Sequence, residues 1–587
     1  GWIGGCSHGD GFVFFVSALA WRPPGAGGRF VAHARRWCYR IKGYPLITVA
    51  SHGQSAPMTN VSAPLPTPRA ELLDRLAQPH LYDLAVIGGG ATGLGVALDA
   101  AARGFSVVLV DSHDFAKGTS SRATKLVHGG VRYLAQGNIS LVREALHERT
   151  TLLSNAPHLA QPLPFVMPSY RFWETPFYGI GLMMYDALAG KAGLGATQFL
   201  GRERTLQCLP TARKDGLKGG VKYWDGQFDD ARLALALART AASRGALLVN
   251  YCPAKKLVHE EGRVAGFECE DVESGRAFTV KARCVVNATG VWVDGLRQMD
   301  GEAIGKPVKP IVAPSQGVHI VVDKEFLPSD HALMVPKTAD GRVLFAVPWL
   351  GKLILGTTDS PRQDVVREPL PFKEEVAFIL NESARYLTRA PKPEDIRSIW
   401  VGLRPLVKPQ DDDGGNTKSI SREHTVLASR SGLVTVTGGK WTTYRAMAED
   451  VLQKCFETGA LEPKAAGVTN QLPLVGTPTE AVRHRISDAP GMHSYGADAP
   501  QVAGLPGAST ALGGGLTEAM VRFAARFEYA RTVEDVLARR SRMLFLDARL
   551  ALEVAPAVAK ILREELGGDP QLPAFLALAP QYLRPEM

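Results

Sequence analysis

The feature that most constrains the fold is a glycine-rich turn between an apolar strand and an alanine-rich helix. Residues 82–87 (Tyr-Asp-Leu-Ala-Val-Ile) predict a short strand, and Gly88-Gly-Gly90-Ala-Thr-Gly93 follows at once. Residues 91–103 predict a helix that Gly104 ends, and residues 106–110 predict a second strand that ends at Asp111. The segment therefore predicts a complete βαβ unit.

The spacing of these residues has a physical reading. Gly88 permits a tight turn, Gly90 lets backbone N–H groups approach a pyrophosphate, and Gly93 lets the helix pack closely on the strand. The positive end of the helix then faces the phosphates. Asp111 lies where a carboxylate would accept hydrogen bonds from an adenosine ribose. We therefore predict that this unit binds a dinucleotide.

Later segments favour FAD as that dinucleotide. Residues 229–244 predict a helix and 246–250 a strand, and residues 264–270 and 277–282 predict a β-ribbon. An apolar strand then runs from Cys284 into Ala288-Thr-Gly290, where Gly290 would let the backbone pass close to a cofactor. A sheet completed by a β-meander and such a strand is typical of FAD-binding folds.

Four further motifs follow in order along the chain. They are Gly118-Thr-Ser-Ser-Arg-Ala-Thr-Lys-Leu-Val-His-Gly-Gly-Val-Arg-Tyr-Leu134, Gly356-Thr-Thr-Asp359, Gly402-Leu-Arg-Pro405 and Gly438-Gly-Lys-Trp-Thr-Thr-Tyr-Arg445. With the βαβ unit they closely resemble the FAD-dependent glycerol-3-phosphate dehydrogenases, respiratory enzymes that pass electrons to quinone, and the resemblance resumes at residues 529–537. It implies oxidation of sn-glycerol 3-phosphate to dihydroxyacetone phosphate by hydride transfer to FAD.

The resemblance also implies which residues form the sites. An Arg fork suits a phosphate and Lys adds a point charge, while Tyr and Thr add neutral hydrogen bonds. The expected substrate-binding residues are Arg132, Tyr133, Arg404, Lys440 and Thr443. Besides the residues of the βαβ unit and Gly290, the residues expected to line FAD are Ser120, Ser121, Lys125, Gly438 and Gly439.

The reaction needs a group that takes the proton of the C2 hydroxyl. His319 is one candidate, because histidine titrates near neutrality. Arg404 could instead polarise the developing carbonyl oxygen, and His128 is a third possibility. Many relatives place a basic residue and Gly-Ser before the histidine, whereas this chain has Gln316-Gly-Val, which changes the expected surroundings of His319. The cysteine spacing gives no reason to expect a metal site.

The expected fold class is α/β, with an FAD-binding Rossmann-type domain, an interleaved antiparallel-sheet substrate domain and a C-terminal α-helical domain. The predicted boundaries are as follows: linker 58–81; FAD-binding domain 82–150, 229–300 and 425–459; substrate-binding domain 151–228 and 301–424; helical domain 479–587. A capping-box pattern at Thr532-Val-Glu-Asp535 predicts a helix start in the last part.

The first 57 residues differ from the rest. Six basic residues and one acidic residue precede Met58, so this segment accounts for five of the nine net positive charges, and the basic pI is no sign of nucleic-acid binding. We interpret residues 1–57 as a non-native or unprocessed extension, with translation beginning at Met58; the rival interpretation is an organelle transit peptide.

Quinone is lipid-soluble, so the resemblance implies a membrane surface as a partner. We expect peripheral attachment at the inner face of the cytoplasmic membrane and a cytoplasmic location. A homodimer is a further expectation. Ubiquinone or another quinone would be the electron acceptor. Residues 177–185 are apolar and could touch lipid, but we favour core packing for them.

Rival functions share the FAD fold. The nearest is a glycerol-3-phosphate oxidase that reduces oxygen, although no long insertion of the kind found in such oxidases is evident. An amino-acid or amine oxidase is more distant, because it needs one carboxylate-binding Arg and three phosphate-suited cations would be surplus. A non-catalytic FAD-binding protein would not need the full set of substrate motifs.

Overall fold

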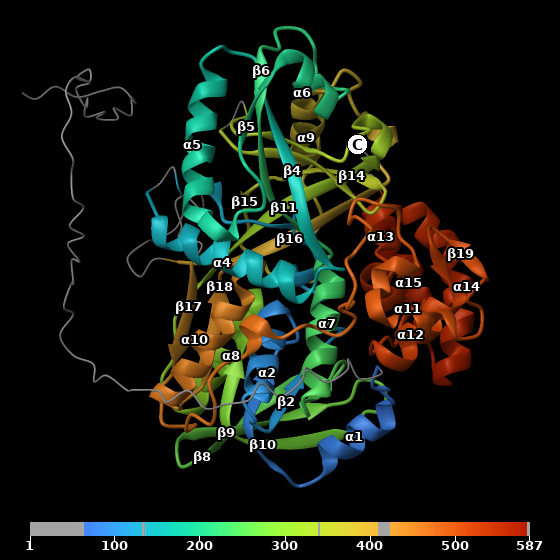
Figure 1. Cartoon of the computed structure of the whole chain (residues 1–587). Coiled ribbons are helices and arrows are strands. Elements are labelled where there is room, and N and C mark those ends of the chain that lie inside the picture. Colours follow the sequence, from blue (N-terminus) through green and yellow to red (C-terminus); the bar gives the residue numbers. More distant parts are fainter. Residues whose placement is uncertain (1–63, 132–133, 135–136, 339–340, 409–422, 584–587) are drawn as a thin grey trace, which may run out of the picture. The chain divides into compact units, whose positions relative to one another are not determined.

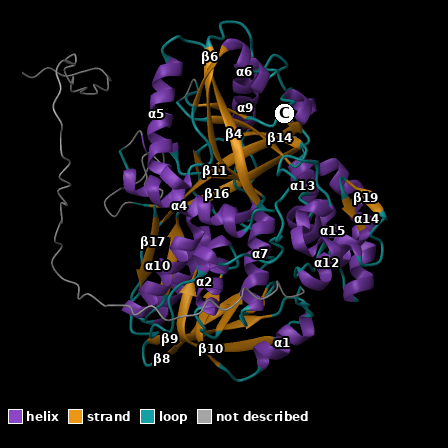
Figure 2. Cartoon of the chain, in the orientation of Figure 1, coloured by secondary structure: helices purple, strands orange, loops and turns teal. Residues whose placement is uncertain are grey.

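The computed structural model describes residues 64–131, 134, 137–338, 341–408 and 423–583 (Figures 1 and 2). The extension 1–57 and the start of the linker 58–81 lie outside the described residues, so the expectations about them stay predictions. Arg132 and Tyr133, two of the expected substrate-binding residues, also lie outside.

The first sheet holds the βαβ unit. Its strands run in the order β17-β18-β10-β1-β2-β7, and β8 and β9 extend it as a ribbon from β10. The neighbours β18, β10, β1, β2 and β7 are parallel to one another. The bounds are β1 (Leu81–Ile87), β2 (Val107–Val110), β7 (Leu247–Val249), β8 (Ala254–Glu260), β9 (Arg263–Glu270), β10 (Ala277–Asn287), β17 (His424–Ala428) and β18 (Val434–Gly438).

Three helices pack together beside this sheet, α2 (Ala91–Ala102) between α7 (Asp230–Ser243) and α10 (Tyr444–Glu457). Two shorter helices, α1 (Arg69–Ala77) and α8 (Val293–Ala303), also contact the first sheet. The alanine-rich sequence of α2 explains its burial: ten of its twelve residues are buried. Parallel strands covered by helices place the ends of β1, β2, β10 and β18 at one edge, where ligands bind in such folds.

The turn between β1 and α2 is as tight as its glycines predict. A Cβ on Gly93 would lie 1.9 Å from the carbonyl oxygen of Gly88, and a Cβ on Gly88 would lie 2.6 Å from that of Ala288. Gly88 also has φ +112°, which favours glycine. The backbones of the turn and of the end of β10 are therefore in direct contact.

The second sheet is mainly antiparallel. Its order is β15-β11-β14-β13-β12-β4-β6-β3, with β16 beside β11 and β5 beside β6, and the β12–β4 pair is parallel. β3 pairs with β6 although it lies within the segment 82–150. The bounds are β3 (Leu126–Val127), β4 (Ala160–Ser169), β5 (Gln198–Gly201), β6 (Gly219–Phe228), β11 (Val312–Asp323), β12 (Ala332–Val335), β13 (Leu344–Trp349), β14 (Lys352–Gly356), β15 (Ser360–Pro361) and β16 (Ser398–Val407).

Helices accompany the second sheet at several points. α9 (Lys373–Tyr386) packs against β11, β13 and β14, while α5 (Glu174–Ala189) and α6 (Arg202–Cys208) contact β5 and β6. α4 (Ile139–Asn155) contacts α5 and β4. The two-sheet architecture is the expected α/β fold.

The C-terminal part is mainly helical, as predicted. Its helices are α11 (Ala499–Ala503), α12 (Glu518–Phe527), a π-helix (Asp535–Arg540), α13 (Met543–Leu546), α14 (Ala548–Leu566) and α15 (Leu572–Leu578), with a short ribbon of β19 (Ala511–Gly513) and β20 (Leu516–Thr517). The predicted capping box is present: the Asp535 N–H donates to Thr532 Oγ1 at 3.2 Å, and the Thr532 N–H donates to Asp535 Oδ2 at 3.0 Å.

A buried carboxylate joins this helical part to the first sheet. Asp114, which follows β2, accepts hydrogen bonds from Arg539 and from Arg540, the latter through Nη2 to Oδ1 at 3.0 Å. The two guanidinium groups hold the pKa of Asp114 below its usual value despite complete burial. Removing one partner of such a buried pair costs about 3–5 kcal/mol, so this contact fixes how the two parts meet.

The expectation that residues 177–185 pack in the core is only partly right. Gly179, Leu182 and Tyr185 face inward along α5. The opposite face carries exposed apolar side chains: Phe177, Ile180, Met183 and Met184, with Phe172 and Trp173 just before the helix. Among the described residues, no helix is both long and apolar enough to cross a membrane.

The glycine contact in the first turn leads to a test. Gly93→Ala forces a methyl group against the Gly88 carbonyl, so we expect destabilisation of about 1–3 kcal/mol and loss of bound FAD. Gly181→Ala in α5 is the matched control, because a Cβ there meets nothing within 4 Å. Thermal melting and flavin content of both variants are the measurements. Equal melting temperatures and flavin contents would contradict the role given to Gly93.

Candidate functional site

A cavity of about 470 Å³ lies at the ends of β1, β2, β10 and β18. Seven of the residues expected to bind FAD line it: Gly88, Gly90, Asp111, Ser120, Gly290, Gly438 and Gly439. We call this cavity the dinucleotide cleft. Gly93 is not among its lining residues; its part is the close packing of α2.

The carboxylate at the end of β2 is held in place by backbone donors. Asp111 accepts the N–H of Gly89 at 2.6 Å and that of His113 at 2.8 Å. Burial raises the pKa of Asp111 to about 6, while these hydrogen bonds and the positive charge of Arg367 oppose the rise. Asp111 is thus a fixed acceptor in the cleft, as recognition of ribose hydroxyls requires.

The cleft suits FAD in its shape and its donors. α2 begins with Gly90 as its N-cap, and the Ala91 N–H donates to Ser120 Oγ at 2.9 Å, so Ser120 is tied to the positive end of the helix. Gly439 borders the cleft just after β18, and a Cβ on it would lie 2.5 Å from Met447 Sδ. A larger residue at position 439 would therefore press on Met447, which also lines the cleft.

Two residues predicted to line FAD are not in contact with either cavity. Neither Ser121 nor Lys125 is among the residues that line the cleft or the cavity beside it. Lys125 is completely buried, donates to Asp230 Oδ2 at 2.6 Å and lies over the Trp400 ring. Burial lowers its pKa to about 7, although Asp230 opposes this shift. Lys125 therefore forms a buried ion pair with Asp230 and lines neither cavity.

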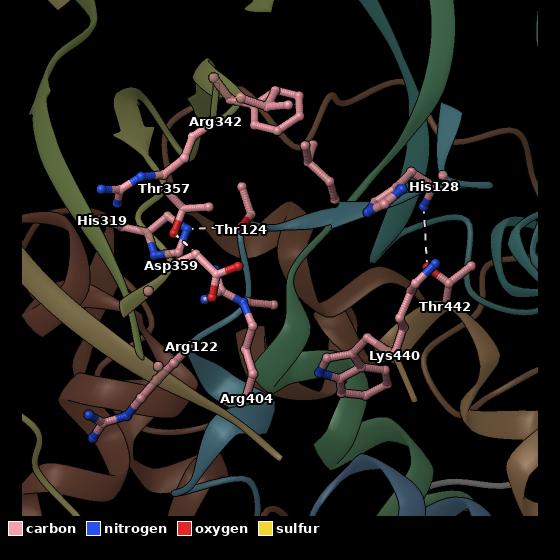
Figure 3. A pocket seen from close by; sticks show the side chains of 18 of the residues that line it. Arg122, Thr124, His128, His319, Arg342, Thr357, Asp359, Arg404, Lys440 and Thr442 are labelled. Carbon is pink, nitrogen blue, oxygen red and sulfur yellow. Dashed lines mark hydrogen bonds and ion pairs between the residues drawn. The ribbon is translucent and has the colours of Figure 1, made fainter. Parts of the chain in front are cut away.

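A second cavity of about 380 Å³ adjoins the cleft, and we call it the substrate cavity (Figure 3). The two cavities share a border made of Thr119, Pro405, Gly438, Gly439, Lys440 and Trp441. Strands of the second sheet supply the opposite wall, including Gly317 and His319 of β11 and Arg404 of β16. A group in the cleft and a small molecule in the second cavity would therefore meet at this border.

Arg404 is oriented by acceptors from two segments, β11 and residues 357–359. Its Nη2 donates to the Thr358 carbonyl at 2.9 Å, and its Nη1 donates to the Gln316 carbonyl at 3.2 Å and lies 3.3 Å from Asp359 Oδ1. Gly317 makes room for it, because a Cβ there would lie 2.4 Å from Arg404 Nη2. Gly317 thus has a local role in seating the guanidinium.

His319 lies in the same cavity, 2% exposed, stacked on Trp400 with ring centroids 4.1 Å apart. Its Nε2 and Thr124 Oγ1 are 2.9 Å apart, and its Nδ1 has no hydrogen-bond partner among the described residues. Burial lowers the pKa of His319 well below its ordinary value, and the charges of Lys125 and Arg404 lower it further. The ring is therefore neutral at physiological pH.

The motif around Lys440 is placed as expected except for its threonine. Lys440 lines both cavities. Thr443 is buried and donates to the Lys440 carbonyl at 3.3 Å, outside the lining. Thr442 lines the substrate cavity instead, and its Oγ1 accepts the His128 N–H at 3.2 Å. His128 also lines that cavity.

Sequence reasoning missed several residues of the substrate cavity. Thr357 and Asp359 belong to the Gly356-Thr-Thr-Asp359 motif, which was noted for the resemblance but given no role. Arg342 and Thr124 also line the cavity. Arg342 begins an alternating strand pattern, so nothing in its local sequence distinguishes it from a solvent-facing residue. Figure 3 shows these side chains around the cavity with Arg404 and His319.

Comparison with known proteins agrees with this geometry. The family "FAD dependent oxidoreductase" matches residues 83–445, and the "C-terminal domain of alpha-glycerophosphate oxidase" matches residues 438–572. The mitochondrial glycerol-3-phosphate dehydrogenase of Rattus norvegicus is 42% identical over 85% of this chain and 73% of its own length. That of Saccharomyces cerevisiae is 36% identical over 86% and 89%.

Solved structures show the same fold. The glycerol-3-phosphate dehydrogenase from Bacillus halodurans, complexed with FAD, has a TM-score of 0.68 and 28% identity, covering 88% of this chain and 98% of that one. The L-alpha-glycerophosphate oxidase from Mycoplasma pneumoniae has a TM-score of 0.51, 16% identity and coverage of 64% and 95%, so it supports the fold alone. By its motifs, its cleft and these likenesses, the chain belongs to the FAD-dependent glycerol-3-phosphate dehydrogenase family.

Proposed function

We propose that the protein oxidises sn-glycerol 3-phosphate to dihydroxyacetone phosphate with FAD and passes the electrons to a membrane quinone. The observation that carries this proposal is the shared border between the dinucleotide cleft and a small cavity that contains Arg404, Lys440 and Arg342. A phosphate dianion on a three-carbon polyol needs such positive charge close to the redox centre.

The phosphate is held by cations around the substrate cavity. We assign this role to Lys440 and Arg342, which line the cavity, and to Arg132, which lies outside the described residues. Among the hydroxyl groups, Thr442 is a better candidate than Thr443, because Thr442 lines the cavity. Tyr133 stays a prediction from its motif.

Arg404 and His319 act on the C2 hydroxyl. Neutral His319 accepts the hydroxyl proton, and Arg404 stabilises the negative charge that develops on the oxygen. Bound FAD supplies the acceptor for the hydride that leaves C2. Stacking on Trp400 and the contact with Thr124 hold the imidazole of His319 in one orientation. The ring therefore loses little conformational freedom when the substrate reacts.

Replacing Arg404 tests these assignments. Arg404→Gln removes charge-assisted hydrogen bonds, and we expect kcat/KM for glycerol 3-phosphate to fall about 100-fold. The charge of Arg404 also lowers the pKa of His319. Its loss raises that pKa, so as the pH falls His319 becomes protonated sooner and the decline of kcat begins at a higher pH. Steady-state kinetics with an artificial dye acceptor over a pH series give both values.

Two control variants separate charge from structure. Arg404→Lys keeps the charge but not the fork, so kcat/KM should fall while the acid limb of kcat stays in place. Arg397→Gln, at a partly exposed Arg that pairs with Asp323 just before β16, should leave both unchanged. An acid limb that does not move in Arg404→Gln would contradict His319 as the proton acceptor.

The membrane part of the proposal rests on α5. Its outer face exposes Phe177, Ile180, Met183 and Met184, and such an exposed apolar surface is suited to contact with lipid and quinone. The matched relatives are named mitochondrial, whereas the sequence led us to expect the inner face of a cytoplasmic membrane. Peripheral attachment is compatible with both locations, and a homodimer stays a prediction.

Charged residues on α5 test this attachment. Burying a Phe or Ile side chain contributes about 1.5–3 kcal/mol, so Phe177→Glu with Ile180→Glu should weaken vesicle binding at least tenfold. Quinone reduction should fall with it, while dye reduction in solution should not change. Cosedimentation with phosphatidylcholine vesicles that contain ubiquinone is the measurement. Val272→Glu is the control, since Val272 is equally exposed (57%) in the turn between β9 and β10. Equal binding of both proteins would count against α5.

A further inference from the structure

The segment between β15 and α9, residues 362–370, borders the dinucleotide cleft although its flanking elements belong to the second sheet and its helix. We call it the strap. Arg367 of the strap is among the residues that line the cleft, near Asp111 and Ser112 at the end of β2. The catalytic assignments above make no use of it.

Arg367 is held over the cleft by two contacts. Its guanidinium lies 4.7 Å from the centre of the Trp292 ring, and its Nη2 donates to Ser112 Oγ at 3.3 Å. Trp292 also lines the cleft, and its Nε1 donates to the Val365 carbonyl of the strap at 3.1 Å. The strap and the segment after β10 therefore meet across this end of the cleft.

The neighbouring residue of the strap is tied to the protein on its other side. Glu368 Oε2 accepts Arg122 Nη2 at 2.7 Å and the Tyr582 hydroxyl at 2.9 Å, and Glu368 Oε1 lies 4.0 Å from Lys117 Nζ. Arg122 and Tyr582 are buried, whereas Arg367 is exposed. Glu368 therefore fixes the strap, and Arg367 presents its free surface to the cleft.

The charge at this end suits the ADP half of a dinucleotide. Asp111 is positioned to accept ribose hydroxyls, and the positive charge of Arg367 lies close enough to lower the pKa of that carboxyl. A planar guanidinium already stacked on an indole can also cover an aromatic base or donate to a phosphate. We propose that the strap is a clasp for bound FAD, in which Arg367 holds the adenosine end and Glu368 keeps the strap in place.

The clasp predicts slower release of FAD than the glycine turn alone would give. Arg367→Ala should raise the dissociation constant of FAD about 10- to 100-fold, as expected for one or two charge-assisted contacts, chiefly through faster release. Release is followed by the rise of flavin fluorescence after dilution of the holoenzyme. ADP, tested as a competitor of FAD for the deflavinated enzyme, should lose affinity in the same variant.

Arg389→Ala is the matched control, because Arg389 also stacks on a ring, that of Phe326, and pairs with Glu325, but lines neither cavity. Its FAD affinity should not change. Glu368→Gln, which leaves the cleft lining intact, should speed FAD release and hydrogen exchange at residues 365–367. Unchanged FAD release in Arg367→Ala, or weaker FAD binding with unchanged ADP binding, would overturn the proposal.

Discussion

The site depends on direct backbone contact between the first βα turn and the end of β10. The backbone at Gly93 packs against the Gly88 carbonyl, and the backbone at Gly88 packs against Ala288. A side chain on either glycine would clash at these contacts. This contact aligns the start of α2 with the ends of the parallel strands, and the dinucleotide cleft is the space that results. The substrate cavity adjoins this cleft, because Gly438, Gly439 and Lys440 border both spaces.

The two cavities hold the residues proposed to react, while buried charged residues outside the cavities hold the parts of the protein together. Lys125 and Asp230 form a buried pair under the site, and Asp114 with Arg539 and Arg540 joins the helical part to the first sheet. Burial of His319 lowers its pKa, and the positive charge of Lys125 lowers it further. Cations that do not contact substrate thus still set the protonation of the group proposed to react.

Much of the fold and of the dinucleotide cleft could be predicted from the sequence, because short local patterns determine them. The βαβ unit, the β-ribbon, the Thr532–Asp535 capping box and the glycines of the cleft follow from short patterns with fixed geometry. Lys125, Ser121 and Thr443 are not among the residues that line the two cavities, because neighbours in a motif can point to opposite sides of a strand or turn. The positions of Arg342 in the cavity wall and of the apolar face of α5 at the surface depend on tertiary contacts. Hydrophobic periodicity in the sequence does not show which surface packs against them.

The most direct test of the central claim is the anaerobic reduction of the bound flavin by sn-glycerol 3-phosphate. The account predicts rapid loss of the absorbance of oxidised FAD, formation of dihydroxyacetone phosphate, and reoxidation by ubiquinone with little peroxide when oxygen is the sole acceptor. Fast peroxide formation would instead make the protein an oxidase. A flavin that stays oxidised with glycerol 3-phosphate but is bleached by an amino acid would contradict the assignment of Arg404 and Lys440 to a phosphate-bearing substrate.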